Sequence, residues 1–134
     1  MTDLQYGPLP QVMRPLLNKF YRAHHSPMRA GSGEQLWVAK DSEVIGALCL
    51  KPIAQGHWLT GLFVAPTKRG QNIASTLLQH AHSQTCGPIW LFCHPVLAAF
   101  YQRLGFQLCP LLPEPLAERL ARYSQTKALV ALVR

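Results

Sequence analysis

Acidic residues are scarce in this chain of 134 residues. Six Asp and Glu stand against 13 Lys and Arg, which gives a formal net charge of +7 although only 14% of the residues are charged. Such an excess of basic residues can bind a nucleic acid, a membrane surface or a small polyanion. The basic residues are scattered, however, and Lys68-Arg69 is their only contiguous pair. This distribution argues against a nucleic-acid partner, because basic tails that bind nucleic acid are runs of like charge.

Long hydrophobic runs, a leader segment and paired cysteines are also missing. The most apolar stretch, residues 89–100, is too short to cross a bilayer and contains His94 and Pro95. The first residues lack a charged segment followed by an apolar one, so no secretory signal is expected. The four cysteines form no Cys-x-x-Cys pair, and Cys93 and His94 would point to opposite faces of a strand. We therefore expect a cytoplasmic protein with reduced thiols, no membrane partner and no metal.

The length and the hydrophobic pattern predict one domain over residues 1–134, built from alternating strands and helices. The first helix is expected to bury Val12, Leu16, Leu17 and Phe20, and the second Ile73, Leu77, Leu78 and Ala81. Adjacent strands followed by a strand–helix alternation predict an α/β or α+β fold with a mixed sheet. The last strand could be interior or could pair in a dimer, so monomer and homodimer both stay open. Helices are expected at 10–24, 71–83, 95–104 and 116–123, and strands at 3–6, 35–39, 43–52, 57–64, 89–93, 106–109 and 128–133.

The stretch from Trp58 to Ser75 carries the clearest chemical signal. A predicted strand runs through a short turn with Lys68, Arg69 and Gly70 directly into a helix. Free N–H groups and the dipole at a helix N-terminus attract anions, and Gly70 allows a ligand close to the main chain. Neither the P-loop nor the Gly-x-Gly-x-x-Gly pattern is present. The turn is a candidate phosphate site, and an ordinary connection with two solvated basic residues is the alternative.

Two motifs resemble those of the GNAT family of acetyltransferases, which bind acetyl-coenzyme A (acetyl-CoA). The family pattern Gln/Arg-x-x-Gly-x-Gly/Ala corresponds to Arg-Gly-Gln-Asn-Ile-Ala at 69–74, with Asn72 where the family has Gly. Asn tolerates unusual backbone angles better than most residues, and a helical backbone at this position would not need Gly, so we expect the turn still to bind the cofactor. The segment 100–106 resembles the second motif, in which a Tyr stands four residues before Gly-Phe. The resemblance implies a GNAT-like, largely antiparallel mixed sheet of six to seven strands, with helices on both faces and a splay between the fourth and fifth strands.

The resemblance also implies how the cofactor is bound. The pantetheine arm would contact main-chain groups of one strand, and the pyrophosphate would sit on N–H groups of the turn that Arg69 opens. His94 stands where many members have a cofactor-contacting Asn, and capping of the following helix is its alternative role. Gly61 suits the β-bulge of the family, and a freed N–H near Leu62 or Phe63 could steady the developing oxyanion. The implied cofactor-binding residues are Leu62, Phe63, Val64, Arg69, Gly70, Gln71, Asn72, Ile73, Ala74, Ser75 and His94.

Tyr101 matches the family's general acid, which protonates the leaving thiolate. A phenol can give this proton and regain it from solvent, while simple packing of the ring is the alternative. The general base is open. Some members place a Glu on the strand before the first motif, but none of the six acids lies between Lys51 and Cys109. His57 or a water molecule is the candidate for this role.

The resemblance thus implies an N-acetyltransferase that moves the acetyl group of acetyl-CoA to the primary amine of a small molecule by direct attack. The family uses its first helices and the loop before its last strand for the acceptor. These segments contain Phe20-Tyr21-Arg22, His24-His25, Met28-Arg29 and residues 110–115. Their Arg and His, and the shortage of acids, favour an amine that also carries a carboxylate or another anionic group. A protein N-terminal or lysine acetyltransferase and a non-catalytic acyl-CoA-binding regulatory domain are the alternatives.

Overall fold

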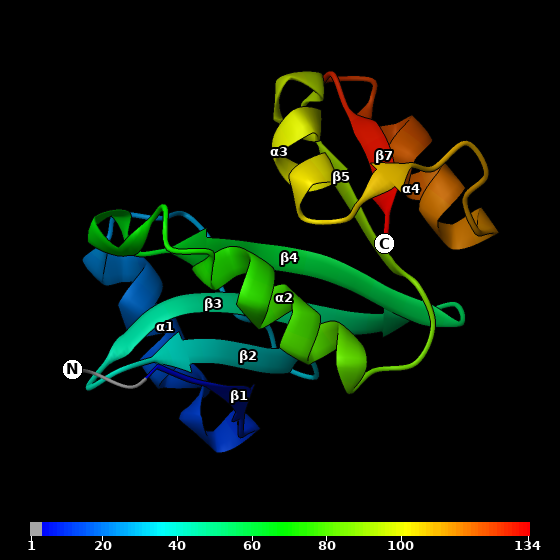
Figure 1. The fold of residues 1–134 in the computed structure, drawn as a ribbon. Coiled ribbons are helices and arrows are strands. Elements are labelled where there is room, and N and C mark those ends of the chain that lie inside the picture. Colours follow the sequence, from blue (N-terminus) through cyan, green and yellow to red (C-terminus); the bar gives the residue numbers. More distant parts are fainter. Residues whose placement is uncertain (1–3) are drawn as a thin grey trace. The chain divides into compact units, whose positions relative to one another are not determined.

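The computed structural model describes residues 4–134, which fold as two compact units (Figure 1). The first unit contains the residues up to Lys51 together with Leu59–Cys86, and the second contains Pro52–Trp58 and Gly87–Arg134. The strands are β1 Gln5–Leu9, β2 Gln35–Lys40, β3 Val44–Ile53, β4 Gly56–Val64, β5 Ile89–Cys93, β6 Gln107–Leu108 and β7 Val130–Val133. The helices are α1 Arg14–Ala23, α2 Ile73–Ser83, α3 Ala98–Arg103 and α4 Glu114–Tyr123, with 3-10 turns η1 Gln11–Met13, η2 Pro66–Lys68 and η3 Pro95–Leu97.

The strands form a seven-stranded sheet in the order β1-β2-β3-β4-β5-β7-β6. The β1–β2, β2–β3, β5–β7 and β6–β7 pairs are antiparallel, whereas β4 and β5 are parallel. The parallel register joins His57 to Ile89 and Trp58 to Trp90, at the beginning of each strand. These pairings confirm the predicted α+β fold with a mixed, largely antiparallel sheet. Strand β7 lies between β5 and β6, so it is interior rather than an edge open to a second copy.

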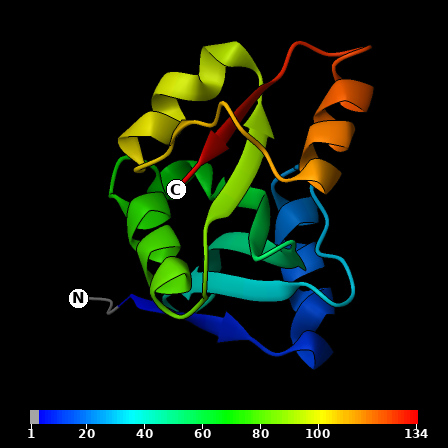
Figure 2. The ribbon, with the colours of Figure 1, turned by 90° about the vertical axis from the view of Figure 1, so that its right-hand side faces the viewer.

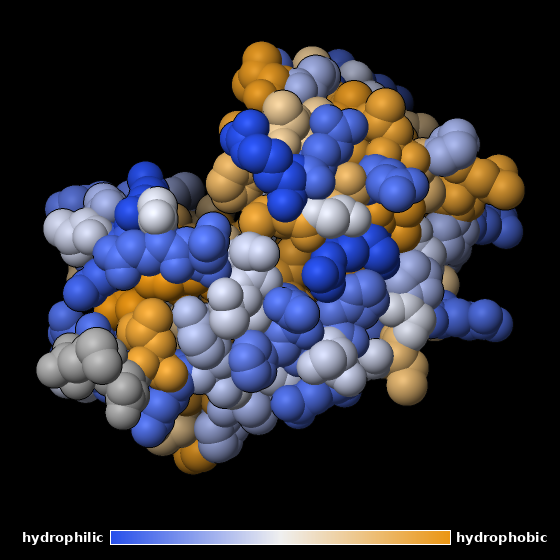
Figure 3. All heavy atoms as spheres, viewed as in Figure 1, coloured by the Kyte–Doolittle hydropathy of each residue, from blue (hydrophilic) through white to orange (hydrophobic). Residues whose placement is uncertain are grey.

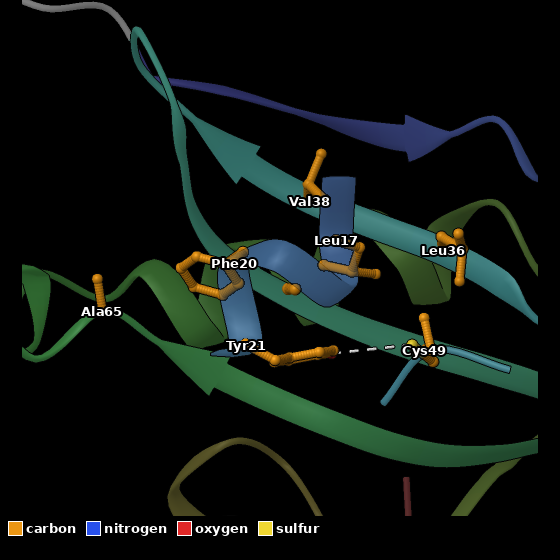
Figure 4. Packing of buried hydrophobic residues seen from close by; sticks show 9 residues of the cluster. Leu17, Phe20, Tyr21, Leu36, Val38, Cys49 and Ala65 are labelled. Carbon is orange, nitrogen blue, oxygen red and sulfur yellow. Dashed lines mark hydrogen bonds between the residues drawn. The ribbon is translucent and has the colours of Figure 1, made fainter. Parts of the chain in front are cut away.

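In the first unit, α1 and α2 cover opposite faces of the sheet (Figures 1 and 2). Helix α1 buries Leu17, Phe20 and Tyr21 against alternate residues of β2 and β3, among them Leu36 and Cys49 (Figure 4). On the other face, Ile73 of α2 packs with Ala39, Ile45 and Val64. Each fully buried aliphatic side chain stabilises the fold by roughly 1.5–3 kcal/mol. Because both helices pack on the sheet, they hold β4 from two sides.

The buried face of α2 is the predicted one, whereas that of α1 was predicted only in part, since Leu17 and Phe20 are buried as expected. Ile73, Leu77, Leu78 and Ala81 are all buried. Helix α1 begins only at Arg14, after the η1 turn, and this start places Val12 outside the helix with 84% of its surface exposed. Leu16 is also exposed, and Tyr21 takes its place in the core. The spacing Leu17, Phe20 and Tyr21 is an i, i+3, i+4 face, so the period was predicted correctly, and the buried face is turned from Leu16 toward Tyr21.

Other element boundaries also differ from the predicted ones. Strand β1 continues to Leu9 through Pro8, which an edge strand tolerates because one side of its backbone needs no ladder partner, and residue 3 of the predicted strand lies outside the described residues. Helix α4 begins at Glu114 because Pro115 is accepted in a first helical turn. Strand β6 is short because the N–H of Phe106 donates to Tyr101 O and closes α3 instead.

In the second unit, α3 and α4 flank the β5–β7 pair (Figure 2). The ring of Trp58 contacts Phe92 edge to face, with centroids 4.5 Å apart, and the guanidinium of Arg119 lies 5.4 Å from the ring centroid of Trp58. An Arg over the face of an indole is a favourable cation–π arrangement. These contacts fix α4 on the first residues of β4 and on β5.

The cysteines are all free thiols, as predicted. Cys49 and Cys93 are buried, Cys109 is half-buried and Cys86 is exposed. Hydrophilic side chains line the outer side of α2 (Figure 3). Over residues 4–134, every helix is too short or too polar to cross a membrane.

Candidate active site

The predicted phosphate turn joins β4 to α2 in the first unit. Gly70 has φ +82°, a left-handed conformation that favours glycine, and a Cβ placed there would meet no atom within 4 Å. The first turn of α2 contains no acidic residue, and its N-cap makes no side-chain hydrogen bond. The first N–H groups of any helix lack partners within the helix. The turn therefore combines an open approach to the main chain with donors and a positive helix end, which suits a phosphate group.

Of the two alternatives for Asn72, the structure shows the unusual backbone conformation and not the helical one. Asn72 is the N-cap of α2 with φ +60° and ψ 24°, in the left-handed region, so the helix begins at Ile73 rather than Gln71. Asn is among the non-glycine residues that adopt this conformation most readily. Asn72 thus replaces the family's Gly with a residue that can also adopt a left-handed backbone conformation. Its carbonyl accepts hydrogen bonds from the N–H and the hydroxyl of Thr76, at 3.0 and 2.8 Å, which anchors the first turn.

The two basic residues of the turn have different partners. Arg69 donates from Nε to Val64 O at 3.0 Å, and its guanidinium lies 5.2 Å from the ring centroid of Phe63. Lys68 Nζ lies 3.8 Å from Asp41 Oδ2. The pKa of the Asp41 carboxyl is lowered, chiefly by the backbone N–H of Glu43 and also by the charge of Lys68. Arg69 is therefore fixed against the end of β4, whereas part of the Lys68 charge is balanced by an acid.

The predicted pantetheine-binding residues Leu62, Phe63 and Val64 form the last part of β4 and are at most half-exposed. Arg69 already uses the carbonyl of Val64, as described above. Gly61, just before them, has φ +66°, the conformation of the first residue in a G1 bulge. Tyr21 of α1 donates its hydroxyl to Gly61 O at 2.6 Å, and so fixes the carbonyl at this bend.

The second unit contains the predicted general acid, Tyr101, on α3. Its side chain is half-buried, and its ring contacts Phe100 and Phe106 edge to face. Burial, and to a lesser extent Cys93, raises the pKa of the Tyr101 phenol. A phenol with a raised pKa keeps its proton at neutral pH. The ring packing of the alternative role is present, and the role of Tyr101 as proton donor stays a prediction.

Two histidines of the second unit were candidates. His94 is the N-cap of η3, and its Nδ1 accepts a hydrogen bond from the N–H of Val96 at 3.1 Å, so the capping role is confirmed. Its contact with the cofactor stays a prediction. His57 pairs with Ile89 at the beginning of β4 and is 9% exposed. Within residues 4–134, its Nδ1 is buried without a hydrogen-bond partner. A buried side chain this early in β4 is poorly suited to meet an incoming amine.

The predicted acceptor residues of α1 separate into two groups. Tyr21 is fully buried and its hydroxyl donates a hydrogen bond to Gly61 O, so the prediction that Tyr21 contacts the acceptor was wrong. Phe20 and His24 line a cavity of about 360 Å³ between α1 and the β2–β3 hairpin, and both rings also contact Phe63. Basic residues predominate among its polar lining: the cavity is lined by Leu16, Lys19, Phe20, Ala23, His24, Lys40, Ser42, Glu43 and Val44.

One acidic residue near β4 was missed in the sequence. The carboxylate of Glu34 accepts hydrogen bonds from the N–H of Gly31 and, at 3.2 Å, from the hydroxyl of Thr60 on β4. The family pattern places a Glu on the strand itself, whereas Glu34 reaches β4 from the loop before β2. The Gly-Ser-Gly-Glu sequence at 31–34 was the available signal, since glycines let a loop bend back. Within the described part of the chain, no cluster of three or more His, Cys, Asp or Glu could hold a metal ion.

Residues 32–108, more than half of the sequence, match the family model of the acetyltransferase (GNAT) domain, and the chain belongs to this family. GNAT proteins are acetyl-CoA-dependent N-acetyltransferases, and this chain is therefore an enzyme of that general type. No curated protein matches the sequence.

Solved structures have the same fold at low sequence identity. The PaiA N-acetyltransferase of Thermoplasma acidophilum in complex with coenzyme A is 15% identical, with a TM-score of 0.68 and 98% of both chains covered. N-acetylglutamate synthase of Neisseria gonorrhoeae, complexed with coenzyme A and N-acetyl-glutamate, is 16% identical with a TM-score of 0.71, and the match covers all of this chain and 35% of that one. The ribosomal-protein-S18-alanine N-acetyltransferase of Escherichia coli is 13% identical with a TM-score of 0.66, over 98% of this chain and 91% of that one.

Proposed function

We propose that the protein transfers the acetyl group of acetyl-CoA to the primary amine of a small molecule that also carries an anionic group. The main support for binding of acetyl-CoA, the acetyl donor, is the β4–α2 turn. Open space adjoins Gly70 in this turn, and Asn72 is the N-cap of α2 in a left-handed conformation. Main-chain N–H groups of residues 70–75 would hold the pyrophosphate, with Arg69 beside them, and His94 would make a further contact. These residues fit a phosphate-bearing cofactor, because the first turn of α2 contains no acid to repel it.

Acetyl-CoA supplies an acetyl group activated as a thioester. Main-chain groups of Leu62, Phe63 and Val64 would orient its pantetheine arm, and an N–H near Leu62 or Phe63 would stabilise negative charge on the carbonyl oxygen. Tyr101 would protonate the departing thiolate and regain its proton from solvent. We also propose that the two units work as one acetyltransferase domain over residues 1–134, since the family match at 32–108 includes residues of both. The free thiols support a reducing compartment such as the cytoplasm.

The cavity beside α1 supports an anionic acceptor. Lys19, Lys40 and His24 outnumber the single acid, Glu43, in its lining. A polyamine would need several acids to balance its charges, whereas a carboxylate would pair with the two lysines. Solved structures with this fold include acetyltransferases of a small molecule and of a protein, so the test has to separate these acceptor classes.

The test is a screen for free-thiol release from acetyl-CoA with the L-amino acids, spermidine and a short peptide with a free N-terminus. We expect turnover of amino acids. Lys40→Ala should raise their KM about tenfold, because a hydrogen bond to a charged group contributes about 1.5 kcal/mol. The KM of the corresponding amino-acid amides and of acetyl-CoA should change little. The exposed Lys127 outside the cavity gives the control variant Lys127→Ala. Turnover of spermidine or the peptide alone would contradict the proposed acceptor class.

A further inference from the structure

The carboxylate of Glu34 is held firmly against β4. One carboxylate oxygen accepts the N–H of Gly31 and the other accepts the hydroxyl of Thr60. The main-chain oxygen of Glu34 in turn accepts a hydrogen bond from the side-chain amide of Gln11 in η1. The residue is half-buried. Glu34 is thus fixed at both its backbone and its carboxylate, which is the arrangement that positions a reactive group.

The acidic residues that the structure describes differ in their surroundings. Asp41 pairs with Lys68, Glu43 lines the cavity at the β2–β3 hairpin, and Glu114 and Glu118 lie on α4. Among residues 4–134, Glu34 is the acid whose carboxylate hydrogen-bonds to a β4 side chain. Thr60 precedes Leu62 by two residues, across the bend at Gly61. The carboxylate of Glu34 is therefore hydrogen-bonded to the segment of β4 directly before the main chain assigned to the thioester.

The charge of Glu34 acts on two titratable groups of neighbouring elements, Tyr21 of α1 and Cys49 of β3. Tyr21 Oη lies 3.8 Å from Cys49 Sγ and is bound to Gly61 O (Figure 4). Burial is the largest cause that raises the pKa of both groups, to about 12 for Cys49, and the charge of Glu34 raises both further. Both groups hold their protons near neutral pH. In this cluster, only the Glu34 carboxylate can accept a proton from a substrate.

We propose that Glu34 is the general base that deprotonates the acceptor amine. This inference rests on the proposed acetyltransferase function. An acceptor arrives as an ammonium ion, and Glu34 takes the first proton, which frees the nitrogen lone pair. The nitrogen then attacks the thioester carbon and forms the C–N bond. It loses a second proton as the C–S bond breaks and the electron pair leaves on sulfur. One proton ends on the coenzyme A thiol through Tyr101, and the other is released from Glu34 to solvent.

The central test compares Glu34→Gln with wild type on the best-accepted amino acid of the screen and on hydroxylamine, which is already neutral at pH 7. General-base catalysis contributes about 10²–10⁴-fold. We expect Glu34→Gln to lower kcat/KM for the amino acid at least 100-fold at pH 7. The deficit should shrink as the pH approaches the pKa of the amine, because solvent then supplies free amine. Hydroxylamine turnover, corrected for the uncatalysed reaction, should fall less than threefold.

Further readouts separate a base from a structural residue. Calorimetric affinity for acetyl-CoA and the thermal midpoint should remain near wild type in Glu34→Gln, and Glu118→Gln on α4 is the matched control. Thr60→Val, which removes only the positioning hydroxyl, should lower kcat/KM about three- to tenfold and keep the wild-type pH profile. If Glu34→Gln is unstable, Thr60→Val compared with wild type on the amino acid and on hydroxylamine tests the proposal instead, and it should lose turnover mainly on the amino acid.

Three different outcomes would overturn the inference. If wild type acetylates an amine and Glu34→Gln does so within threefold at every pH, Glu34 is not the base and the proposed function stands. If wild type releases no thiol with any amine, the proposed function fails and the base assignment fails with it. An equal loss on the amino acid and on hydroxylamine would also contradict proton transfer by Glu34.

Discussion

Replacement of Gly61 by alanine should destabilise the protein through Tyr21. Gly61 has φ +66°, and a Cβ there would lie 2.6 Å from Tyr21 Oη, closer than non-bonded atoms approach. The left-handed conformation costs a residue with a Cβ about 1–2 kcal/mol. Tyr21 must also move away and lose its hydrogen bond to Gly61 O, which leaves a buried carbonyl unpaired at a cost of about 1–3 kcal/mol. Gly61→Ala should therefore lower the free energy of unfolding by about 2–5 kcal/mol.

A double-mutant cycle tests this reasoning. Tyr21→Phe alone removes the hydrogen bond and should cost about 1–3 kcal/mol. In the double variant the bond is lost only once, so its cost should fall short of the sum of the single costs by about 1–3 kcal/mol. Urea unfolding of the four proteins gives these values. Gly33→Ala is the control for backbone strain, because Gly33 has φ +78° and a Cβ added to it would meet no atom within 4 Å. Additive costs, within about 0.5 kcal/mol, would refute the contact between these residues.

The remaining predictions concern the proton donor and the buried thiol. Tyr101→Phe should lower kcat tenfold or more, with little change in acetyl-CoA affinity in a calorimetric titration; unchanged turnover would remove Tyr101 from the mechanism. Burial raises the pKa of Cys49 to about 12, whereas an unfolded thiol titrates near about 8.5. The stabilisation linked to Cys49 is therefore full below about pH 8.5 and is lost as the pH rises toward about 12. Urea midpoints across this range should fall for wild type and fall less steeply for Cys49→Ala; equal slopes would contradict the assignment. A thiol reagent should label exposed Cys86 in the native protein and Cys49 only after unfolding, which mass spectrometry of the labelled sites would check.

Local patterns predicted most of the elements because their signals lie within a few residues. The apolar stripe of α2 and the turn before it are of this kind, since the period of 3.6 and the Arg-Gly pair can be read directly. The phase of α1 could not be read in this way. Tyr21 is buried because Gly61, 40 residues later, offers its carbonyl, and no local pattern contains that partner.

The site itself was predicted unevenly for the same reason. Residues 69–75 form one continuous segment, and a short motif identifies them. Asn72 needed the backbone angles, because Asn is compatible with both helical and left-handed conformations. Glu34 depends on the path of the loop after α1 and on its hydrogen bond to Thr60, 26 residues away. The backbone angles of Asn72 and the long-range contact of Glu34 therefore emerged only from the structure.

The central claim is that the turn between β4 and α2 binds acetyl-CoA through its main chain. Calorimetric titration of acetyl-CoA into wild type, Gly70→Ala and Gly33→Ala tests this claim most directly. Both variants place a Cβ on a left-handed residue with open space around it, so they share the same backbone strain. We predict that wild type binds, that Gly70→Ala weakens binding at least tenfold because its methyl group occupies the ligand's approach, and that Gly33→Ala binds like wild type. Equal affinity of Gly70→Ala and Gly33→Ala, or no binding to wild type, would contradict the account.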